Sequence, residues 1–389
     1  MQPFELLDRF ELLEQDNENL SLLRRSYIDK DLSSIFKLLS LTNDEAVTEE
    51  IRKAVLEKNL YSLFRLITVP LEKEEWYEDF RRSVTEQNMY CVFRLVQFHA
   101  DSSEWIDDFR RAVTEHNLYS LFRCMASELN VDNLEDFKSA VTEENLHSIF
   151  RLVENEHLRK FVLEDNQWSM WKLLAEYTPT QFVAAFKNFF VNNIDINDDC
   201  LSRGQVQSKL WLVRELKKLD LDLGMVFLCA GWYATLSTMM FEAGLKIFKL
   251  RSFDIDPTCV AIADRFNKPW EIDQWRFKAV TADILNLNYS ETTYEVYKPD
   301  GSSSSFTDIP DTIINTSCEH IPNFDQWYAK IPEGKLLILQ TNNYFEIEDH
   351  INCSASLEEF RAQCPMQEVM FAGKLALDKY TRYMLIGRK

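Results

Sequence analysis

The amino-acid sequence predicts two fold classes in one chain: an α-helical solenoid over residues 1–180 and an α/β domain over residues 195–389. Three observations support this prediction. The length of 389 residues exceeds what one hydrophobic core usually holds. A self-similar segment recurs through the first half, and strand-like and helix-like segments alternate in the second half. Apolar residues make up 46% of the chain, which is enough for packed cores.

The repeats of the first half have a period near 29 residues. Four clear copies are AVLEKNLYSLFRLI (54–67), SVTEQNMYCVFRLV (83–96), AVTEHNLYSLFRCM (112–125) and AVTEENLHSIFRLV (140–153). This period fits two short helices per unit, with apolar residues three or four positions apart. One such pair cannot bury its apolar face alone, so stacked pairs are expected. An asparagine stands between the two helices of each unit, where it caps a helix or adopts a left-handed conformation: Asn59, Asn88, Asn117 and Asn145.

An arginine follows the central aromatic residue of each copy: Arg65, Arg94, Arg123 and Arg151. These arginines either form a basic ladder that binds a ligand or pair with acidic residues of the neighbouring unit. Residues 1–200 carry 22 Lys and Arg against 38 Asp and Glu, so the array is acidic and the ion pairs are favoured. The net charge of −20 makes nucleic acid an improbable partner, and a basic protein is the partner that charge favours.

Several classes of protein are excluded by what the sequence lacks. No apolar run of about 18 residues is present, so no membrane partner or membrane span is expected. The N-terminal residues lack the basic and apolar regions of a signal peptide. The eight cysteines form no CxxC pair, which excludes tetrahedral zinc sites of that pattern. No metal site is expected. Reduced thiols of this kind are typical of a cytoplasmic protein.

The second half alternates between helices and strands. Helices are expected at 202–219, 232–244 and 257–267, strands at 224–231, 247–256, 275–283, 311–317 and 335–343, a loop or small hairpin at 290–310, and a closing hairpin at 374–389. This order implies a mostly parallel sheet with helices on both faces. Ligands of such sheets bind at the carboxyl ends of the strands.

The residues at the strand ends are therefore the candidate ligand-binding residues. Gly231 ends the first strand, where a glycine lets a ligand approach the backbone. Asp254 ends the second strand, where a carboxylate accepts hydrogen bonds from ribose hydroxyls. The alternative is that an acid here caps the next helix, but Asp256, directly before Pro257, fits that role better. Asp283 ends the third strand, either as a ligand-binding acid or as a solvated turn residue.

The fourth strand runs into INTSCEHIPNFDQWYAKIPEGKLLILQTNN (314–343). From about residue 200 to 389, the order of a glycine turn, two strand-end acids and a strand leading into "EH" resembles class I S-adenosylmethionine-dependent methyltransferases. The resemblance implies a Rossmann-like, doubly wound fold with S-adenosylmethionine as cofactor. It also implies the binding residues: Gly231 at the methionine end, with the bulky Trp232 and Tyr233 beside it, Asp254 at the ribose, Asp283 at the adenine amine, and Asn315, Thr316 and Ser317 beside the sulfonium.

The sequence departs from the family in the glycine turn, because AGWYA keeps only Gly231 of the usual GxGxG. Methyl transfer needs orientation and, for some acceptors, a base that takes a proton. Glu319, His320 and His350 are the candidate catalytic residues. Alternatively, Glu319 and His320 only organise the start of a helix, where a glutamate is favoured.

The resulting hypothesis is a methyltransferase that acts on a small-molecule or protein acceptor, with the helical repeats as a docking or assembly module. The alternative is a methyltransferase-like fold without activity, which serves as an interaction or structural protein.

Overall fold

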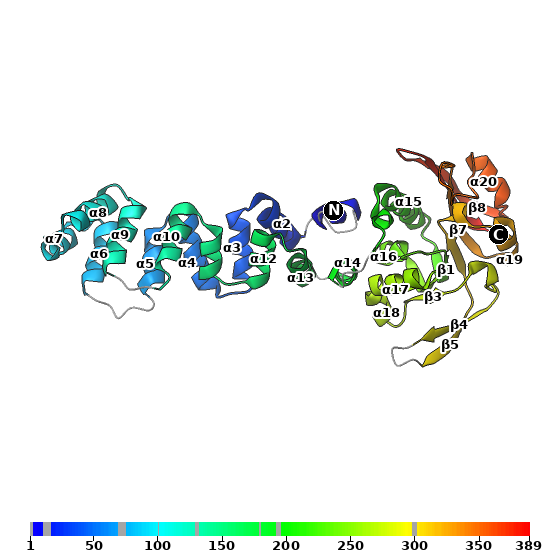
Figure 1. The fold of residues 1–389 in the computed structure, drawn as a ribbon, viewed down its shortest axis with the longest axis horizontal. Helices are drawn as coiled ribbons and strands as arrows, with labels where there is room; N and C mark the ends of the chain where they lie inside the picture. The colour runs from blue at the N-terminus through cyan, green and yellow to red at the C-terminus, as the bar shows by residue number, and fades with distance from the viewer. Residues whose placement is uncertain are drawn as a thin grey trace. The chain divides into compact units, whose positions relative to one another are not determined.

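The computed structural model describes residues 3–10, 17–68, 75–99, 101–128, 132–178, 180–191, 196–297 and 302–389. The chain forms two compact units, one of residues 16–178 and one of residues 1–15 together with 179–389 (Figure 1). The first helix, α1 (Pro3–Phe10), therefore belongs to the C-terminal unit rather than to the predicted array. Its Phe10 ring packs 5.1 Å from Phe182 of α14 (Gln181–Val191).

The array consists of helix pairs, as the period predicts. Its elements are α2 (Glu18–Arg24), η1 (Arg25–Asp29), α3 (Leu32–Ser40), α4 (Glu45–Leu56), α5 (Leu60–Thr68), α6 (Glu75–Thr85), α7 (Met89–Phe98), α8 (Ser103–Thr114), α9 (Leu118–Glu128), α10 (Leu134–Glu143), α11 (Leu146–Leu152), α12 (Glu156–Glu164) and α13 (Gln167–Tyr177). The helical-repeat prediction is confirmed in this respect.

The asparagines between paired helices are N-caps. The side-chain oxygen of Asn117, for example, accepts a hydrogen bond from Ser120 N at 3.0 Å. The left-handed residue of each junction is the one before the asparagine: Lys58, Gln87, His116 and Glu144, with φ between 48° and 52°. The asparagine caps the second helix, and its neighbour makes the turn.

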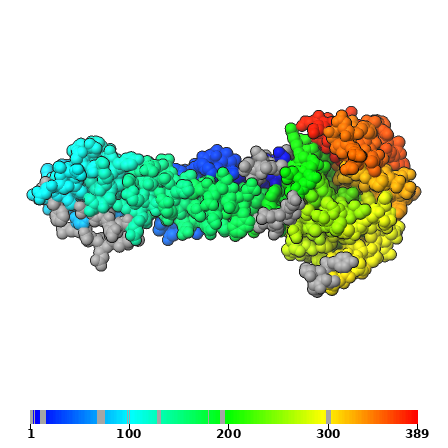
Figure 2. Space-filling view, viewed as in Figure 1, coloured from blue at the N-terminus to red at the C-terminus, as the bar shows by residue number. Residues whose placement is uncertain are grey.

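The array folds back on itself, which the repeat period does not reveal. The early elements η1 and α4 contact the late helices α12 and α10, and early and late segments meet in both views (Figures 1 and 2). Tyr27 stacks on Phe161 at 4.8 Å, and Asn155 Nδ2 donates to Thr42 Oγ1 at 2.8 Å. The chain thus runs outward to α7 and returns from α8, which gives two rows of helix pairs. Phe93, on α7 at this reversal, is 65% exposed, whereas its counterparts in the other pairs are buried.

Each of the repeated arginines forms an ion pair within its own unit. Each pairs with an acid 15 positions earlier, on the first helix of its own pair: Arg65 with Glu50 (2.8 Å), Arg94 with Asp79 (3.1 Å), Arg123 with Asp108, and Arg151 with Asp136 (2.5 Å). Because the two helices of a pair are antiparallel neighbours, this spacing brings the charges together. The basic-ladder interpretation loses its support.

The C-terminal unit contains a seven-stranded sheet in the order β3-β2-β1-β6-β7-β9-β8. The strands are β1 (Asp222–Cys229), β2 (Lys246–Asp254), β3 (Phe277–Thr281), β6 (Thr312–Asn315), β7 (Leu336–Asn342), β8 (Glu368–Ala376) and β9 (Thr381–Arg388). Strands β1, β2, β3, β6 and β7 are parallel, while β9 runs antiparallel to both β7 and β8. Within the range 290–310, β4 (Thr292–Tyr297) and β5 (Ser303–Asp308) pair as a separate antiparallel sheet. The predicted doubly wound α/β fold is confirmed.

The connections of this sheet are helices and short helical turns. They are η2 (Asp198–Leu201), α15 (Arg203–Leu219), α16 (Thr235–Glu242), α17 (Pro257–Phe266), α18 (Lys268–Ile272), η3 (Ile284–Asn286), η4 (Cys318–His320), α19 (Phe324–Lys330) and α20 (Leu357–Gln363). Because β1 lies between β2 and β6, the strand order reverses beside β1. A crevice is expected at the carboxyl ends of β1 and β6.

Candidate functional site

A cavity of about 930 Å³ lies at this carboxyl edge. Its walls come from the turn after β1, the start of α15, the turn η4, the loop after β7 and the β8–β9 connection. The cavity brings together nine of the predicted site residues: Gly231, Trp232, Tyr233, Asp254, Thr316, Ser317, Glu319, His320 and His350. These residues are up to 119 positions apart in the chain, so the fold, and not local sequence, assembles the site.

The turn after β1 has three left-handed residues at alternating positions. Ala230, Trp232 and Ala234 have φ values of 51°, 51° and 49°, a region that favours glycine. This spacing is that of the glycines in GxGxG, so Gly231 stands between the glycine positions and does not occupy one of them. A Cβ on Gly231 would lie 2.0 Å from the Ser252 side chain of β2. Gly231 lines the cavity, and its packing against Ser252 also requires a glycine at this position.

The two aromatic residues of the turn have different surroundings. Tyr233 is buried, and its hydroxyl accepts a hydrogen bond from Asn197 N at 3.3 Å. It thereby holds the segment before α15 against the turn. Trp232 is half-buried, and its ring stacks on Tyr233 with 4.8 Å between centroids. Both residues line the cavity on the side of the turn.

Asp254 and Asp256 have the separate structural positions that the sequence predicts. Asp256 caps α17: its carboxylate accepts from Thr258 N at 2.8 Å, and this bond lowers the pKa of Asp256. Asp254 lies in the cavity wall at the end of β2. Its Oδ2 accepts from Trp232 N at 2.8 Å and its Oδ1 from Asp256 N at 3.1 Å. The carboxylate of Asp254 thus also joins the turn after β1 to the end of β2.

Two predicted cofactor residues do not line the cavity. Asp283 caps η3, since its two oxygens accept from Leu285 N and Asn286 Nδ2, both at 2.9 Å. This is the turn role that the sequence left open as an alternative. Asn315 is fully buried, and its Oδ1 accepts from Ser317 N at 2.9 Å. Asn315 shapes the wall from beneath.

Two buried cations line the cavity, and neither was predicted from the sequence. Arg382 of β9 is 4% exposed, and its Nη1 donates to Thr316 O at 2.9 Å and to Glu319 Oε1 at 3.1 Å. Lys209 of α15 is 8% exposed and donates to Gln205 Oε1 at 2.6 Å. Burial lowers the pKa of Lys209 to about 8, and the nearby Arg382 contributes to this shift. A charged residue inside an otherwise apolar strand, as in TRYMLIGR, was the one available signal for Arg382.

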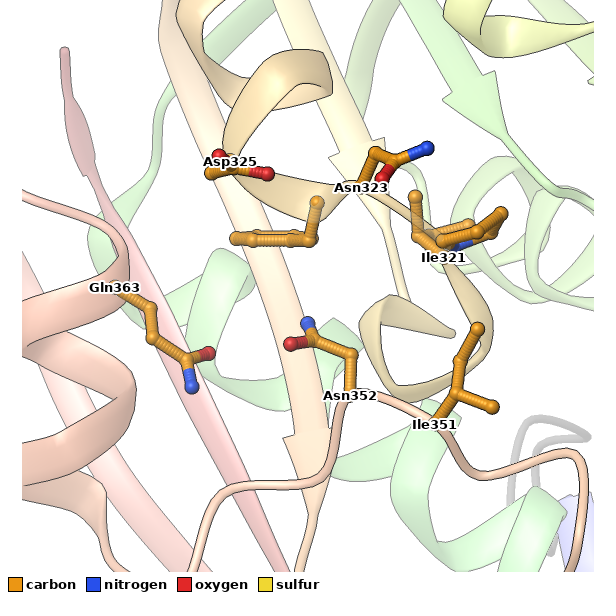
Figure 3. Close-up of a pocket in the computed structure, with 8 residues that line it drawn as sticks. Ile321, Asn323, Asp325, Ile351, Asn352 and Gln363 are labelled. Carbon is orange, nitrogen blue, oxygen red and sulfur yellow. The ribbon is translucent and has the colours of Figure 1, made fainter.

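A smaller hollow of about 350 Å³ borders the turn η4 (Figure 3). Ile321 and Ile351 line it, and each directly follows one of the two histidines of the larger cavity. The side-chain amides of Asn352 and Gln363 face this hollow in Figure 3. Residues 319–321 and 350–352 therefore separate a large polar cavity from a smaller one.

Among the described residues, no helix combines the length and the apolar character needed to cross a bilayer.

Known proteins resemble this chain in structure but not in sequence. No protein-family model matches the chain, and no curated protein matches it. Solved structures that it resembles include the N-methyltransferase NodS from Bradyrhizobium japonicum WM9, with 8% identity, 53% of this chain and 98% of that chain covered, and a TM-score of 0.36. Another is magnesium protoporphyrin IX methyltransferase from Synechocystis PCC 6803, with 14% identity and a TM-score of 0.35. The match covers 56% of this chain and 96% of that chain.

A further similar structure is a putative methyltransferase from Bacillus halodurans C-125, with 10% identity and a TM-score of 0.32. The match covers 46% of this chain and 98% of that chain. At such identities and scores these likenesses carry no argument about activity. The description of the C-terminal half therefore rests on its own strand order and cavity. That half has the Rossmann-like, doubly wound fold. The three solved structures named here are described as methyltransferases.

Proposed function

We propose that the C-terminal unit binds S-adenosylmethionine in the 930 Å³ cavity and transfers its methyl group to a small-molecule or protein acceptor. One observation carries this proposal: the cavity combines a strand-end carboxylate with an excess of buried positive charge. Lys209 and Arg382 are buried cations, whereas Glu319 is the buried carboxylate among the described residues of the wall.

These residues fit the polar ends of the cofactor. The Nε atom of Arg382 is buried without a hydrogen-bond partner among the described residues, and Lys209 lies in the same wall. A carboxylate such as that of the methionine moiety would satisfy both cations. Each oxygen of Asp254 accepts one backbone N–H and keeps further lone pairs, which would accept hydrogen bonds from ribose hydroxyls.

The bound cofactor would supply an electrophilic methyl group, and the protein would supply orientation. Thr316 and Ser317 line the wall between the turn after β1 and η4. Arg382 holds that segment through the carbonyl oxygen of Thr316. The acceptor end of the cavity is assigned to His320 and His350, because Oε1 of Glu319 already accepts from Arg382 and Asn342.

The competing proposal, a fold without activity, has one observation in its favour. Trp232 occupies a left-handed position at which a glycine would leave more room for a ligand. Calorimetry and thermal melting of the full chain with S-adenosylhomocysteine separate the two proposals. We expect a stabilisation of about 2.7 kcal/mol at a hundredfold excess over the dissociation constant. No binding heat and no melting shift at millimolar ligand would favour the interaction protein.

The helical array is proposed as a docking or assembly module for a basic protein. Support comes from its acidic surface and from exposed aromatic side chains at equivalent positions of the second helices: Tyr61, Tyr90, Tyr119 and Trp168, each at least 42% exposed. Surface aromatic residues and complementary charge are common in protein interfaces. The eight cysteines are scattered and form no CxxC pair, a usage that supports a cytoplasmic location.

A further inference from the structure

Three side chains with metal-ligating atoms meet at one wall of the cavity. One such atom from each of Glu319, His320 and His350 lies within 4.8 Å of the other two. A metal ion bound at about 2.1 Å holds its ligand atoms about 3–4 Å apart, so only small side-chain rotations would be needed. Glu319 and His320 belong to the turn η4, and His350 lies in the loop after β7.

Two hydrogen bonds from Asn352 hold these two segments together. Asn352 N donates to Glu319 O at 2.9 Å, and Asn352 Nδ2 donates to Cys318 O at 3.2 Å. The imidazole rings of His320 and His350 consequently meet edge to face, with 4.6 Å between their centroids. The cluster is therefore built into the fold and does not depend on a chance approach of surface side chains.

Both histidines use the same ring nitrogen, Nδ1, for a contact with a backbone carbonyl oxygen. Nδ1 of His320 lies 3.1 Å from Asp349 O, and Nδ1 of His350 lies 2.8 Å from Tyr344 O. A carbonyl oxygen only accepts, so each Nδ1 carries the hydrogen, and each Nε2 of a neutral ring has a free lone pair. Metal-binding histidines in proteins are typically oriented in this way, by a backbone carbonyl on the other nitrogen.

Glu319 supplies an independent observation that points to a ligand. Its side chain is 3% exposed, and Oε1 accepts from Arg382 Nη1 at 3.1 Å and from Asn342 Nδ2 at 2.6 Å. Its Oε2 is buried and has no hydrogen-bond partner among the described residues. A buried carboxylate oxygen without a partner is costly, and a bound cation would compensate it.

We propose that Glu319, His320 and His350 bind a divalent transition-metal ion such as Zn²⁺ or Co²⁺. Two imidazoles and one carboxylate form a donor set of intermediate softness, which favours such ions over Ca²⁺ and Mg²⁺. Three protein ligands leave at least one coordination position open. All three residues line the cavity, so an oxygen atom of the methyl acceptor would occupy that position.

The role at the acceptor rests on the proposed methyl transfer, whereas metal binding itself does not. A histidine whose Nε2 binds a metal ion cannot use that nitrogen as a general base, because its lone pair is already engaged. The prediction from sequence of no metal site is thereby replaced by a specific alternative that a binding experiment decides.

The test is a titration of the full-length, metal-free protein with Co²⁺, followed by visible absorption, with competition by Zn²⁺. We expect one equivalent of Co²⁺ to bind, and at least tenfold weaker binding by His320→Ala and by His350→Ala. His147→Ala is the matched control, because His147 is a histidine of the other compact unit. A thiolate charge-transfer band, no binding by the wild-type protein, or unchanged binding by both variants would overturn the proposal.

Cofactor binding is measured separately on the same proteins. His350→Ala should still be stabilised by S-adenosylhomocysteine while it loses Co²⁺. Asp254→Ala should show the reverse pattern. Absence of a Co²⁺ response in the wild-type protein therefore refutes the metal site alone, and absence of its S-adenosylhomocysteine response refutes the proposed cofactor.

Discussion

Asp254 is the residue whose substitution tests the proposed cofactor site most directly, because the neighbouring Asp256 already caps the next helix. We expect Asp254→Ala to weaken the binding of S-adenosylhomocysteine by about 3–6 kcal/mol, because two hydrogen bonds between ribose hydroxyls and a charged group would be lost. Asp256→Ala removes only the cap of α17 and should leave the affinity unchanged, while the free energy of unfolding falls by about 1 kcal/mol.

The structure adds a cost in stability for the first variant. Asp254 accepts from Trp232 N and Asp256 N, so alanine leaves two backbone donors of the turn without their partner. Since the carboxylate is only half-buried and water can replace it, we expect a loss of about 1–2 kcal/mol in the free energy of unfolding. Asp254→Asn keeps the size of the side chain and one acceptor oxygen, and it serves as the intermediate variant.

The assay pairs isothermal titration of S-adenosylhomocysteine with urea unfolding of the same full-length proteins. A loss of about 3 kcal/mol is a weakening of more than a hundredfold, which calorimetry resolves easily. If Asp256→Ala loses the ligand and Asp254→Ala retains it, the carboxylate assignment is wrong. If both variants bind like the wild-type protein, the ribose site lies elsewhere.

Four further predictions concern stability. Arg382→Met should lower the free energy of unfolding by about 3–5 kcal/mol, because it leaves the buried Glu319 without its counter-charge. Adding Glu319→Gln should restore part of this loss. An equal loss in the single and the double variant would contradict the pairing. Burial lowers the pKa of Lys209 to about 8 in the folded protein, against about 10.5 in the unfolded chain. The unfolded chain therefore binds more protons between these two pH values, and the free energy of unfolding should rise with pH in this window. The rise should be smaller in Lys209→Met. Asn117→Ala should cost about 1 kcal/mol in urea unfolding, and no measurable cost would contradict the cap. A fragment of residues 16–178 should fold alone and melt cooperatively, with a helical circular dichroism spectrum; aggregation or a strand spectrum would contradict its independence.

The features that the sequence determined are those set by neighbouring residues. Helix pairs follow from apolar spacing within about 29 residues, and their junctions follow from an asparagine that caps the next helix. Asp254 and Asp256 were separable because Pro257 marks where α17 begins. Strand–helix alternation likewise predicted the parallel sheet and hence the edge at which the cavity lies.

The glycine turn shows where inference from sequence reached its limit. A single glycine in AGWYA suggested that Gly231 kept a family position. Only the backbone angles reveal that Ala230, Trp232 and Ala234 occupy the left-handed positions. The identity of a residue restricts φ but does not determine it, and the surrounding structure holds these non-glycine residues in a region they rarely adopt.

Tertiary structure alone decided which distant residues meet. The return of the array brings Tyr27 to Phe161, and the insertion of β9 between β7 and β8 brings Arg382 to Glu319, 63 positions away. The pairing of His320 with His350 depends in the same way on two loops that follow neighbouring strands. Local spacing and capping act within a few residues and can be read directly from the sequence. Contacts between distant segments depend on strand order and packing, which many sequences of the same local pattern would satisfy differently.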